Sequence, residues 1–525
     1  MDHRASNAAI HFIDRHPAEG RGEKIAFIDA DGPHTYGDLA PKVNQAGNLL
    51  RSIGVARGDR VMLCLNDAIA FPVLFFGALK IGAVPVPVNA LLVAEDYRYM
   101  VRDCAPRAVA VSADLLDRCE PALTGALDPA RILIVGGGGV GEARPKIGRA
   151  PYNYVAFDTA LASSRDQLDA VKIAPDETGF LLYSSGSTGG PKGVIHRHGD
   201  LRETAQLYSS GVLALDDHDV IFSASKLFFA YGLGNSCTFT LHAGATAILM
   251  PDRLTPEAVL ATLRDHNVTA FFGFPTLYSA ILAFLENHPD ERLENLRLCV
   301  SAGEALPAAL GERWRARFGL EILDGIGSTE SLHIFISNRP DDVKHGASGK
   351  PVAGYGVALR DDHGVEITSD LIGDLWCRGP SIALGYWNNQ DATQRTFVDG
   401  WLRTGDKYSR DADGYYHYAG RADDMLKVGG VWVSPHEVES ALIAHPAVLE
   451  AAVVAHPDGD GLVKPKAFVV LKDPATASPA LAAALIQFVK GRIAPYKYPH
   501  WIEFRADLPK TATGKIRRNV LRDQG

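Results

Sequence analysis

The chain of 525 residues has only six cysteines, and no two of them have CxxC spacing. They are Cys64, Cys104, Cys119, Cys237, Cys299 and Cys377. Structural zinc sites and disulfide frameworks both need cysteines at short, regular spacings. The cysteine content therefore argues against a structural metal and favours the reduced cytosol.

The sequence also lacks a long uninterrupted apolar segment. Its most apolar stretch, residues 68–93, is broken by Lys80, Pro72, Pro85 and Pro87, whereas a membrane-spanning helix needs about 20 mainly apolar residues. The N-terminal sequence MDHRASNAAIHFIDRH carries charges throughout and has no apolar signal-peptide core. We expect a cytoplasmic protein without a membrane partner.

An excess of positive charge is the third absence. The chain has 53 Lys and Arg against 62 Asp and Glu, a formal net charge of −9, which argues against nucleic acid as a partner. Apolar residues make up 46% and charged residues 22% of the chain, values typical of globular proteins. The length predicts about two to four structural units.

The order of sequence patterns predicts an α/β protein. From about residue 25 to 350, strand-like runs such as 60–65 and 108–111 alternate with helix-like stretches such as 36–53. After residue 350, short strands with glycine turns indicate a small β-rich subdomain. The last hundred residues resemble a separate α+β unit. We place the domains at 1–420 and 421–525.

The most informative segment is SSGSTGGPKG, residues 184–193, which follows the apolar run 180–183. Its glycines let the backbone approach an anion, its hydroxyls donate hydrogen bonds, and Lys192 adds positive charge. It is not a Walker A loop, because Pro191 precedes Lys192 and Gly193 follows it. We predict a loop that binds the polyphosphate of ATP, with a flexible surface turn as the alternative.

A second glycine-rich segment, GGGGVG at 136–141, satisfies the dinucleotide pattern G-x-G-x-x-G after a strand-like run. The residues that follow include Pro145 and Pro151 and do not open an amphipathic helix. A pyrophosphate would have no helix N-terminus to bind. We interpret this segment as a loop.

Five segments in order carry a family resemblance: SSGSTGGPKG, KLFFAYGLGN (226–235), DGIGSTE (324–330), RTGD (403–406) with GRADDMLK (420–427), and PKTATGKIRR (509–518). Together they resemble the adenylate-forming superfamily of acyl-CoA synthetases, most closely benzoate-CoA and hydroxybenzoate-CoA ligases. The resemblance covers nearly the whole chain. It implies a large N-terminal domain of two α/β subdomains and a β-barrel-like subdomain, followed by a small mobile α+β domain.

The resemblance implies an ATP-dependent reaction in which an aromatic carboxylate is joined to AMP and then transferred to coenzyme A. Lys515, Lys192, Glu330 and Thr188 would be catalytic, with Glu330 and Thr188 at a Mg²⁺ ion. Lys515 would stabilise the transition state of the first step electrostatically. The nucleotide site would comprise Ser184, Ser185, Gly186, Ser187, Thr188, Gly189, Lys192, Gly303, Glu304, Ala305, Asp324, Gly325, Ile326, Thr329, Asp406, Arg421 and Lys515.

In the same superfamily the acyl pocket would be lined by Phe229, Ala230, Tyr231, Gly232, Ala302, Gly303, Gly327, His333 and Ile334. Its aromatic residues favour a flat ring, and benzoate, hydroxybenzoate and aminobenzoate stay open. Asp423 would be the hinge about which the C-terminal domain swings, and Gly430 would lie beside the coenzyme A tunnel.

Several of these residues have plainer alternatives. Glu330 is also consistent with the N-terminal acid of a helix, Asp406 with a turn residue, and Lys515 with a solvated basic tail. One of the aromatics at 228, 229 and 231 is expected to belong to the core. For the whole chain, the alternatives are loading of a carrier protein and a regulatory protein with an inactive site. A homodimer is left open.

Overall fold

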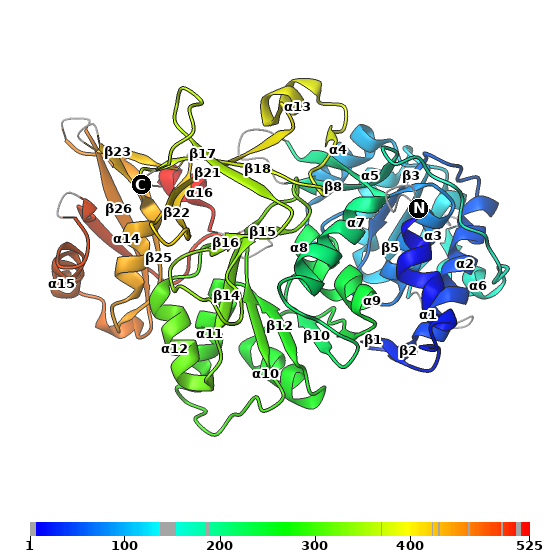
Figure 1. Cartoon of the computed structure of the whole chain (residues 1–525), viewed down its shortest axis with the longest axis horizontal. Coiled ribbons are helices and arrows are strands. Elements are labelled where there is room, and N and C mark those ends of the chain that lie inside the picture. Colours follow the sequence, from blue (N-terminus) through cyan, green and yellow to red (C-terminus); the bar gives the residue numbers. More distant parts are fainter. Residues whose placement is uncertain are drawn as a thin grey trace.

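The chain forms two largely parallel sheets, two smaller antiparallel sheets and a C-terminal α+β unit (Figure 1). The computed structural model describes residues 7–136, 154–184, 190–368, 370–422, 424–428, 431–459, 462–494, 497–510 and 516–524. Most of the segment 136–141, interpreted above as a loop, lies outside these residues. The fold agrees with the predicted α/β class.

The first sheet has the strand order β4-β3-β5-β6-β7, and every neighbouring pair is parallel. Its strands are β3 (Arg60–Cys64), β4 (Val84–Pro87), β5 (Ala108–Ser112), β6 (Ile132–Val135) and β7 (Val155–Ala156). The central strand β5 is buried along its whole length. Strands covered on both faces read as continuous apolar runs, which explains why the sequence shows them clearly.

The second sheet has the order β16-β15-β14-β13-β12-β10-β11-β1-β2. Its strands are β1 (Ile25–Asp29), β2 (Gly32–Thr35), β10 (Val220–Ser223), β11 (Thr246–Ile248), β12 (Ala270–Gly273), β13 (Leu298–Ser301), β14 (Ile322–Gly327), β15 (Ile334–Ser337) and β16 (Lys350–Pro351). The pairs from β1 through β11, β10, β12 and β13 to β14 are parallel. β15 then runs antiparallel to β14, so the chain reverses at residues 328–333.

Helices connect and cover these strands. They are α1 (Arg15–Ala18), α2 (Tyr36–Ser52), α3 (Ala70–Lys80), α4 (Ala94–Cys104), α5 (Leu116–Leu123), α6 (Phe157–Ala162), α7 (His198–Thr204), α8 (Ala230–Gly232), α9 (Thr240–Ala243), α10 (Pro256–Asp265), α11 (Pro275–Leu285), α12 (Ala308–Phe318) and α13 (Gln390–Thr396). Short irregular helices are η2 (Ile10–Asp14), η3 (Ala113–Leu115), η4 (Pro129–Arg131), η5 (Ala205–Ser210) and η6 (Leu233–Phe239). Thr35 caps α2 through a reciprocal pair with Asp38.

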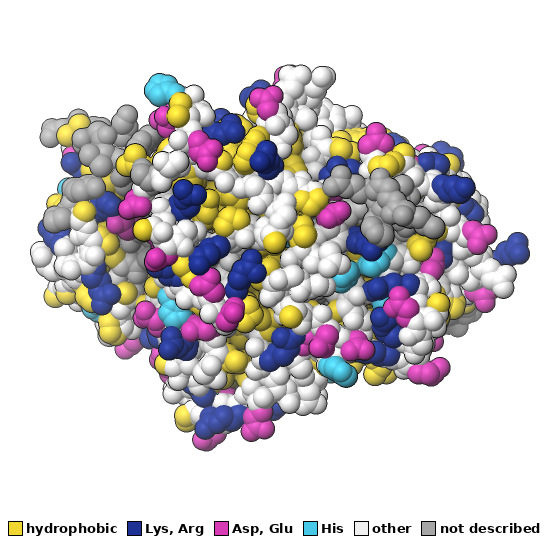
Figure 2. Space-filling model, in the orientation of Figure 1, with side chains coloured by type: hydrophobic (Ala, Val, Ile, Leu, Met, Phe, Trp, Pro, Cys, Tyr) yellow, Lys and Arg dark blue, Asp and Glu magenta, His cyan; other side chains and the backbone are white. Residues whose placement is uncertain are grey.

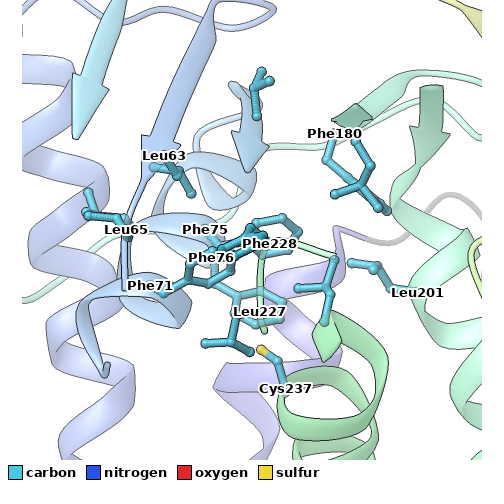
Figure 3. Close-up of a cluster of buried hydrophobic side chains, with 14 of the residues drawn as sticks. Leu63, Leu65, Phe71, Phe75, Phe76, Phe180, Leu201, Leu227, Phe228 and Cys237 are labelled. Carbon is cyan, nitrogen blue, oxygen red and sulfur yellow. The ribbon is translucent and has the colours of Figure 1, made fainter. Parts of the chain in front are cut away.

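The main core joins the two sheets. The phenylalanines of α3 lie beside Phe180, Leu227 and Phe228 (Figure 3). The rings of Phe75 and Phe180 meet edge to face with centroids 5.7 Å apart. Phe228 is 6% exposed within this cluster, so it is the core aromatic that was expected among residues 228, 229 and 231.

A hairpin carries the glycine-rich segment. β8 (Thr178–Ser184) pairs antiparallel with β9 (Lys192–Arg197), and β19 (Gly385–Tyr386) adds to β9 on its other side. Lys192 is therefore the first residue of a strand and pairs in register with Ser184. Of the glycine-rich segment, Ser184 is the last residue of β8, and Lys192 and Gly193 belong to β9.

The small β-rich region is an antiparallel sheet of β17 (Gly356–Arg360), β18 (Gly373–Arg378), β20 (Phe397–Val398), β21 (Trp401–Arg410) and β22 (Tyr416–Arg421). The segment 403–406 lies inside β21 and not in a turn. Asp406 pairs in register with Arg421 of β22. The alternative that Asp406 is a turn residue is therefore wrong.

The C-terminal elements have hydrophobic clusters of their own. They are β23 (Leu426–Val428), β24 (Val431–Val433), α14 (Pro435–Ile443), β25 (Val448–Pro457), β26 (Val463–Leu471), η7 (Pro474–Thr476), α15 (Pro479–Lys490), β27 (Trp501–Arg505) and α16 (Arg518–Gln524). Figure 1 shows them beside α12 and the antiparallel sheet. Lys472 contacts Glu286 at 3.0 Å across this junction.

Two further observations concern the surface. Lys and Arg side chains alternate with Asp and Glu side chains over the face shown in Figure 2. Of the helices in the described ranges, none has both the length and the apolar character that a membrane crossing requires.

Candidate active site

The carboxylate of Glu330 stands at the centre of a polar cluster below the glycine-rich hairpin. Its Oε1 accepts hydrogen bonds from the Tyr386 hydroxyl at 2.8 Å and from Ser184 Oγ at 3.4 Å. Residues 328–333 form a turn between β14 and β15, so the alternative that Glu330 begins a helix is wrong. Segments separated by more than 140 residues in sequence thus meet at one carboxylate.

Tyr386 was not identified from the sequence. It is 8% exposed, and the Lys192 ammonium lies 5.2 Å from the centre of its ring. Burial, followed by the nearby Glu330 carboxylate, raises the pKa of Tyr386, so the hydroxyl stays a neutral donor. A lone tyrosine in a two-residue strand gives no sequence signal, because its partner lies 56 positions away.

The other residues predicted in the glycine-rich loop cannot be placed. Ser185, Gly186, Ser187, Thr188 and Gly189 lie outside the described residues, whereas Ser184 and Lys192 flank them on paired strands. Asp423, Gly430 and Lys515 also lie outside the described residues. Their predicted roles stay predictions.

Asp324, within β14, and its neighbours form a second polar group. The side chain is 4% exposed; Oδ2 accepts from Ser348 Oγ at 3.4 Å, and Oδ1 has no hydrogen-bond partner among the described residues. Burial raises the pKa of Asp324 well above its usual range. A buried carboxyl with a free oxygen can pair with a polar group that enters the site.

Ser348 links this group to β21, because its hydroxyl also lies 3.1 Å from that of Tyr408. Two residues away, Asp406 is 9% exposed and forms an ion pair with Arg421 at 3.1 Å. Gly405 has φ +77°, and a Cβ there would lie 2.9 Å from the Arg421 guanidinium. Glycine therefore allows Arg421 to reach Asp406 across the hairpin.

The turn after β13 carries Ala302, Gly303, Glu304 and Ala305. Ala302 is buried, while Gly303 has φ +92° and is exposed. Glu304 Oε1 accepts a hydrogen bond from the backbone N–H of Ile516 at 3.2 Å. The C-terminal unit thus contacts the turn whose residues 303–305 were predicted to belong to the nucleotide site.

Aromatic rings surround His333, the residue before β15. Its ring centroid lies 4.5 Å from Phe239, 5.3 Å from Tyr208 and 5.5 Å from Tyr231. Nε2 lies 3.1 Å from Asn235 Oδ1. Burial lowers the pKa of His333 to about 3, so its imidazole is neutral at physiological pH.

Two buried polar atoms of this cluster, His333 Nδ1 and the Tyr231 hydroxyl, have no hydrogen-bond partner in the described part of the chain. Such groups are uncommon in protein interiors unless a ligand or water completes them. Phe229 and Ala230 are half-buried beside Tyr231. The aromatic residues therefore form an apolar surface that contains two polar atoms able to bind a ligand.

Glycines bring the pocket elements together. A Cβ on Gly232 would lie 2.1 Å from the Lys226 carbonyl oxygen. Gly325 and Gly327 of β14 would meet Ile334 and His333 at 2.9 Å and 2.5 Å if they had a Cβ. Close contact between backbone and neighbouring groups needs glycine at these positions.

Ile326 lies in strand β14, whereas Ser331 lies in the turn that follows this strand. Ile326 is half-buried and pairs with Ile336 of β15. The Ser331 hydroxyl is bound within its turn, at 2.9 Å from the His333 carbonyl oxygen and the Ser328 N–H. It is fully buried, so this hydroxyl is already bound within the turn, whereas His333 Nδ1 has no partner among the described residues.

Asp67 supports the pocket from the first sheet and was also missed. Its Oδ1 accepts from the Leu227 N–H at 3.0 Å, one residue before Phe228. Burial raises the pKa of Asp67 to about 6. No local pattern marks this contact, because the two residues are 160 positions apart.

The chain is similar to known proteins over nearly its whole length. Residues 14–387 match the AMP-binding enzyme family and residues 437–515 match the AMP-binding enzyme C-terminal domain. Benzoate–CoA ligase of Thauera aromatica is 52% identical over 518 residues, 98% of this chain and 95% of that protein. The 4-hydroxybenzoate–CoA/benzoate–CoA ligase of Rhodopseudomonas palustris is 45% identical over 524 residues, 100% of this chain and 95% of that protein.

Solved structures give the same result. The anthranilate CoA ligase AuaEII in complex with anthranoyl-AMP has a TM-score of 0.93 and 42% identity, covering 99% of this chain and 97% of that chain. A benzoate CoA ligase from Burkholderia xenovorans LB400 has a TM-score of 0.87 and 44% identity, covering 98% and 100%. The predicted adenylate-forming fold is confirmed. The chain is a member of the AMP-binding enzyme family.

Proposed function

We propose that this protein is an ATP-dependent aryl-CoA ligase. It activates benzoate or a substituted benzoate as the aryl-AMP anhydride, releasing pyrophosphate, and then forms aryl-CoA and AMP. The observation that carries the proposal is the meeting of Ser184, Tyr386 and Glu330 beneath the glycine-rich hairpin. Relatives with the matching names cover nearly the full chain.

A divalent cation fits the oxygen donors at this point. Among the described residues there is no cluster of three or more His, Cys, Asp or Glu side chains that could hold a metal. Mg²⁺ is commonly bound by one or two carboxylates together with substrate phosphates. Glu330 would supply the carboxylate and Thr188 a hydroxyl, and the bound ion would neutralise charge on the phosphates.

The nucleotide would extend from the hairpin to β21. Lys192 and the loop hydroxyls would bind its phosphates, and Asp406 would accept from the ribose hydroxyls while Arg421 holds that carboxylate in place. Asp324 would pair with the base through its free oxygen. The Glu304 turn would cover the base together with residues 324–326.

The acyl group would lie against the aromatic cluster. Phe229, Tyr231 and the neutral His333 form a surface suited to a flat ring. A ring hydroxyl or amino group could reach His333 Nδ1 or the Tyr231 hydroxyl, and burying such a substituent unpaired costs about 1–3 kcal/mol. Overlapping use of benzoate and its hydroxy and amino derivatives is expected.

The C-terminal unit would act as a lid. We assign residues 1–420 to nucleotide and acyl binding and residues 421–525 to the lid, with Asp423 as its hinge and Gly430 beside the coenzyme A tunnel. The contact between Ile516 and Glu304 joins this unit to a turn assigned to the nucleotide, and Lys515 would act there. Movement of the lid would withdraw that lysine for the second half-reaction.

The test measures exchange of labelled pyrophosphate into ATP with Mg²⁺ and a panel of acids: benzoate, its hydroxy and amino derivatives, and a short aliphatic acid. Exchange with ring acids, and formation of the thioester with free coenzyme A, are expected. Absence of exchange with every ring acid would refute the proposal. Exchange without any thioester would instead indicate transfer to a carrier protein.

A further inference from the structure

The turn that carries Glu330 is strained. Leu332 has φ +68°, a left-handed conformation that costs a residue with a side chain roughly 1–2 kcal/mol. The Leu332 N–H donates to the Thr329 carbonyl at 3.1 Å, and the Ser331 N–H donates to Ser328 Oγ at 3.2 Å. Strain of this kind persists where surrounding contacts fix it, often at functional sites.

Three successive backbone carbonyls of this turn, at residues 329–331, accept hydrogen bonds from residues outside it. The Ala383 N–H donates to the Glu330 carbonyl at 2.9 Å. Ser381 Oγ donates to the Ser331 carbonyl at 2.7 Å. The third carbonyl, that of Thr329, is bound by a side chain of the hairpin.

That side chain is His196 of β9. Its Nε2 lies 2.8 Å from the Thr329 carbonyl oxygen, and its Nδ1 lies 3.2 Å from Asp200 Oδ2. His196 is 0% exposed. Its ring stacks on Phe180 with centroids 5.1 Å apart and an interplanar angle of 19°, so the imidazole is fixed in plane as well as in position.

Asp200 connects this contact to the other two. It accepts from the Arg197 N–H at 3.0 Å and from Arg197 Nε at 2.9 Å. Arg197 Nη2 in turn donates to the carbonyls of Pro380 and Ile382 at 2.9 Å and 2.8 Å. The strand that carries Lys192 therefore holds both the Glu330 turn and the segment that clamps it.

We propose that His196, oriented by Asp200, is a positioning residue that fixes the Glu330 turn and thereby aims its carboxylate at nucleotide-bound Mg²⁺. The proposal rests on the aryl-CoA ligase function for the role of Glu330, but the contact itself does not. His196 does not touch the reacting atoms. It acts through the Thr329 carbonyl, one peptide from the carboxylate.

The test compares His196→Leu with His196→Gln, whose amide can donate to Thr329 in place of Nε2. His196→Asn, whose amide is too short to reach that carbonyl, replaces the leucine variant if the latter does not fold. His198→Leu is the matched control. His198 is 2% exposed and two residues further on, and its Nδ1 accepts from the Ala8 N–H at 3.3 Å, away from the turn.

The first measurement is hydrogen exchange of the amides of Ser331 and Leu332 in the ligand-free protein. His196→Leu is expected to raise their exchange rates by roughly tenfold, the effect of weakening a local structure by one buried hydrogen bond. His196→Gln and His198→Leu should leave both rates near those of the unmodified chain.

The second measurement is the Mg²⁺ concentration that half-saturates ATP binding, followed by calorimetry. Loss of a group that orients a metal ligand typically weakens metal affinity 10–100-fold, so His196→Leu should raise this concentration by at least tenfold. The KM for benzoate should change less than twofold. Rescue by glutamine separates positioning from a general loss of stability.

Three outcomes overturn the proposal. The first is unchanged exchange and Mg²⁺ dependence in His196→Leu, the second is the same changes in His198→Leu, and the third is a parallel rise of the benzoate KM in His196→Leu. If the unmodified protein exchanges no pyrophosphate with any acid, the proposed function fails. The amide exchange and the calorimetry would still decide whether His196 fixes the turn.

Discussion

At the scale of single residues, Lys515 is one peptide bond away from a residue with a defined contact, because the Ile516 N–H binds Glu304 at 3.2 Å. We predict that Lys515→Ala lowers pyrophosphate exchange by about 10²–10³-fold, the usual cost of removing one electrostatic stabiliser of a transition state. Thioester formation from supplied aryl-AMP should stay within about twofold. Separate assays of the two half-reactions provide the measurement.

Lys510→Ala is the control for this prediction, because Lys510 lies in the same basic tail and is paired with Glu450 at 2.7 Å. It should leave both half-reactions unchanged. An equal loss of both half-reactions in Lys515→Ala would contradict its assignment to the first step, and unchanged rates would mean that the lysine is a solvated residue of the tail.

The sequence could identify charged residues that lie within recognisable motifs. Glu330, Asp406 and Arg421 stand out as charged residues within recognisable segments, and the structure brings Asp406 and Arg421 into contact. Tyr386 and His196 were missed, because their importance comes from hydrogen bonds to residues 56 and 133 positions away. Long-range pairing leaves no local pattern in the chain.

At the scale of elements, η6 meets the residue that precedes β15, because Gly234 faces His333. A Cβ on Gly234 would lie 2.4 Å from His333 Cδ2, and the surrounding rings of Tyr208 and Phe239 leave the imidazole little room to move. Gly234→Ala should therefore displace His333 and raise the KM for the aromatic acid about tenfold. Overpacking should also lower stability by about 1–3 kcal/mol.

Steady-state kinetics with each substrate varied in turn check this prediction. The KM for ATP should change less than twofold, because the nucleotide residues lie on other elements. Gly22→Ala is the control, since no atom lies within 4 Å of a Cβ at that position. A KM for the acid that is unchanged in Gly234→Ala would show that the aromatic cluster does not bind it.

Element types were predictable where burial imposes a clear period. The helix expected over 36–53 is α2 (Tyr36–Ser52), and the strands expected over 60–65 and 108–111 are β3 and β5. Short strands with glycine turns were expected after residue 350, but β21 (Trp401–Arg410) has ten residues and includes Gly405. Gly405 and Asp406 are typical turn residues, and only the pairing with β22 makes them part of a strand.

At the scale of the whole molecule, the sequence predicted the order of units but not their contacts. The change of pattern near residue 420 marks a separate C-terminal unit, and the boundary at 420 stays a prediction. The contacts of Lys472 with Glu286 and of Ile516 with Glu304 depend on how complete units fit together. No short window of sequence contains that information.

Acid sensitivity is also a property of the whole molecule, because buried histidines occur in several of its parts. Burial lowers the pKa of His16 to about 3, that of His198 to about 4 and that of His333 to about 3. Below pH 6.5 these side chains take up protons when the chain unfolds but not in the folded state. Each histidine therefore lowers the free energy of unfolding by about 1.4 kcal/mol for every unit by which the pH is decreased below 6.5.

Asp67 opposes this trend, since its raised pKa of about 6 makes the folded state bind a proton that the unfolded state does not. Comparing the free energy of unfolding of a histidine variant with that of the unmodified chain isolates the contribution of one histidine, because the contribution of Asp67 is the same in both. His16 is suitable because it is 0% exposed, lies 4.1 Å from the Tyr36 ring, and has no hydrogen-bond partner for either ring nitrogen in the described residues.

The quantity compared is the free energy of unfolding of His16→Phe minus that of the unmodified chain. We predict that this difference is about 2 kcal/mol larger at pH 5.0 than at pH 7.5, because the phenylalanine ring takes up no proton on unfolding. Urea unfolding at both pH values gives the two differences. His218, whose side chain is 92% exposed, provides the control, and His218→Phe should show no such change. An equal difference at both pH values would mean that His16 takes up its proton in the folded state as readily as in the unfolded chain.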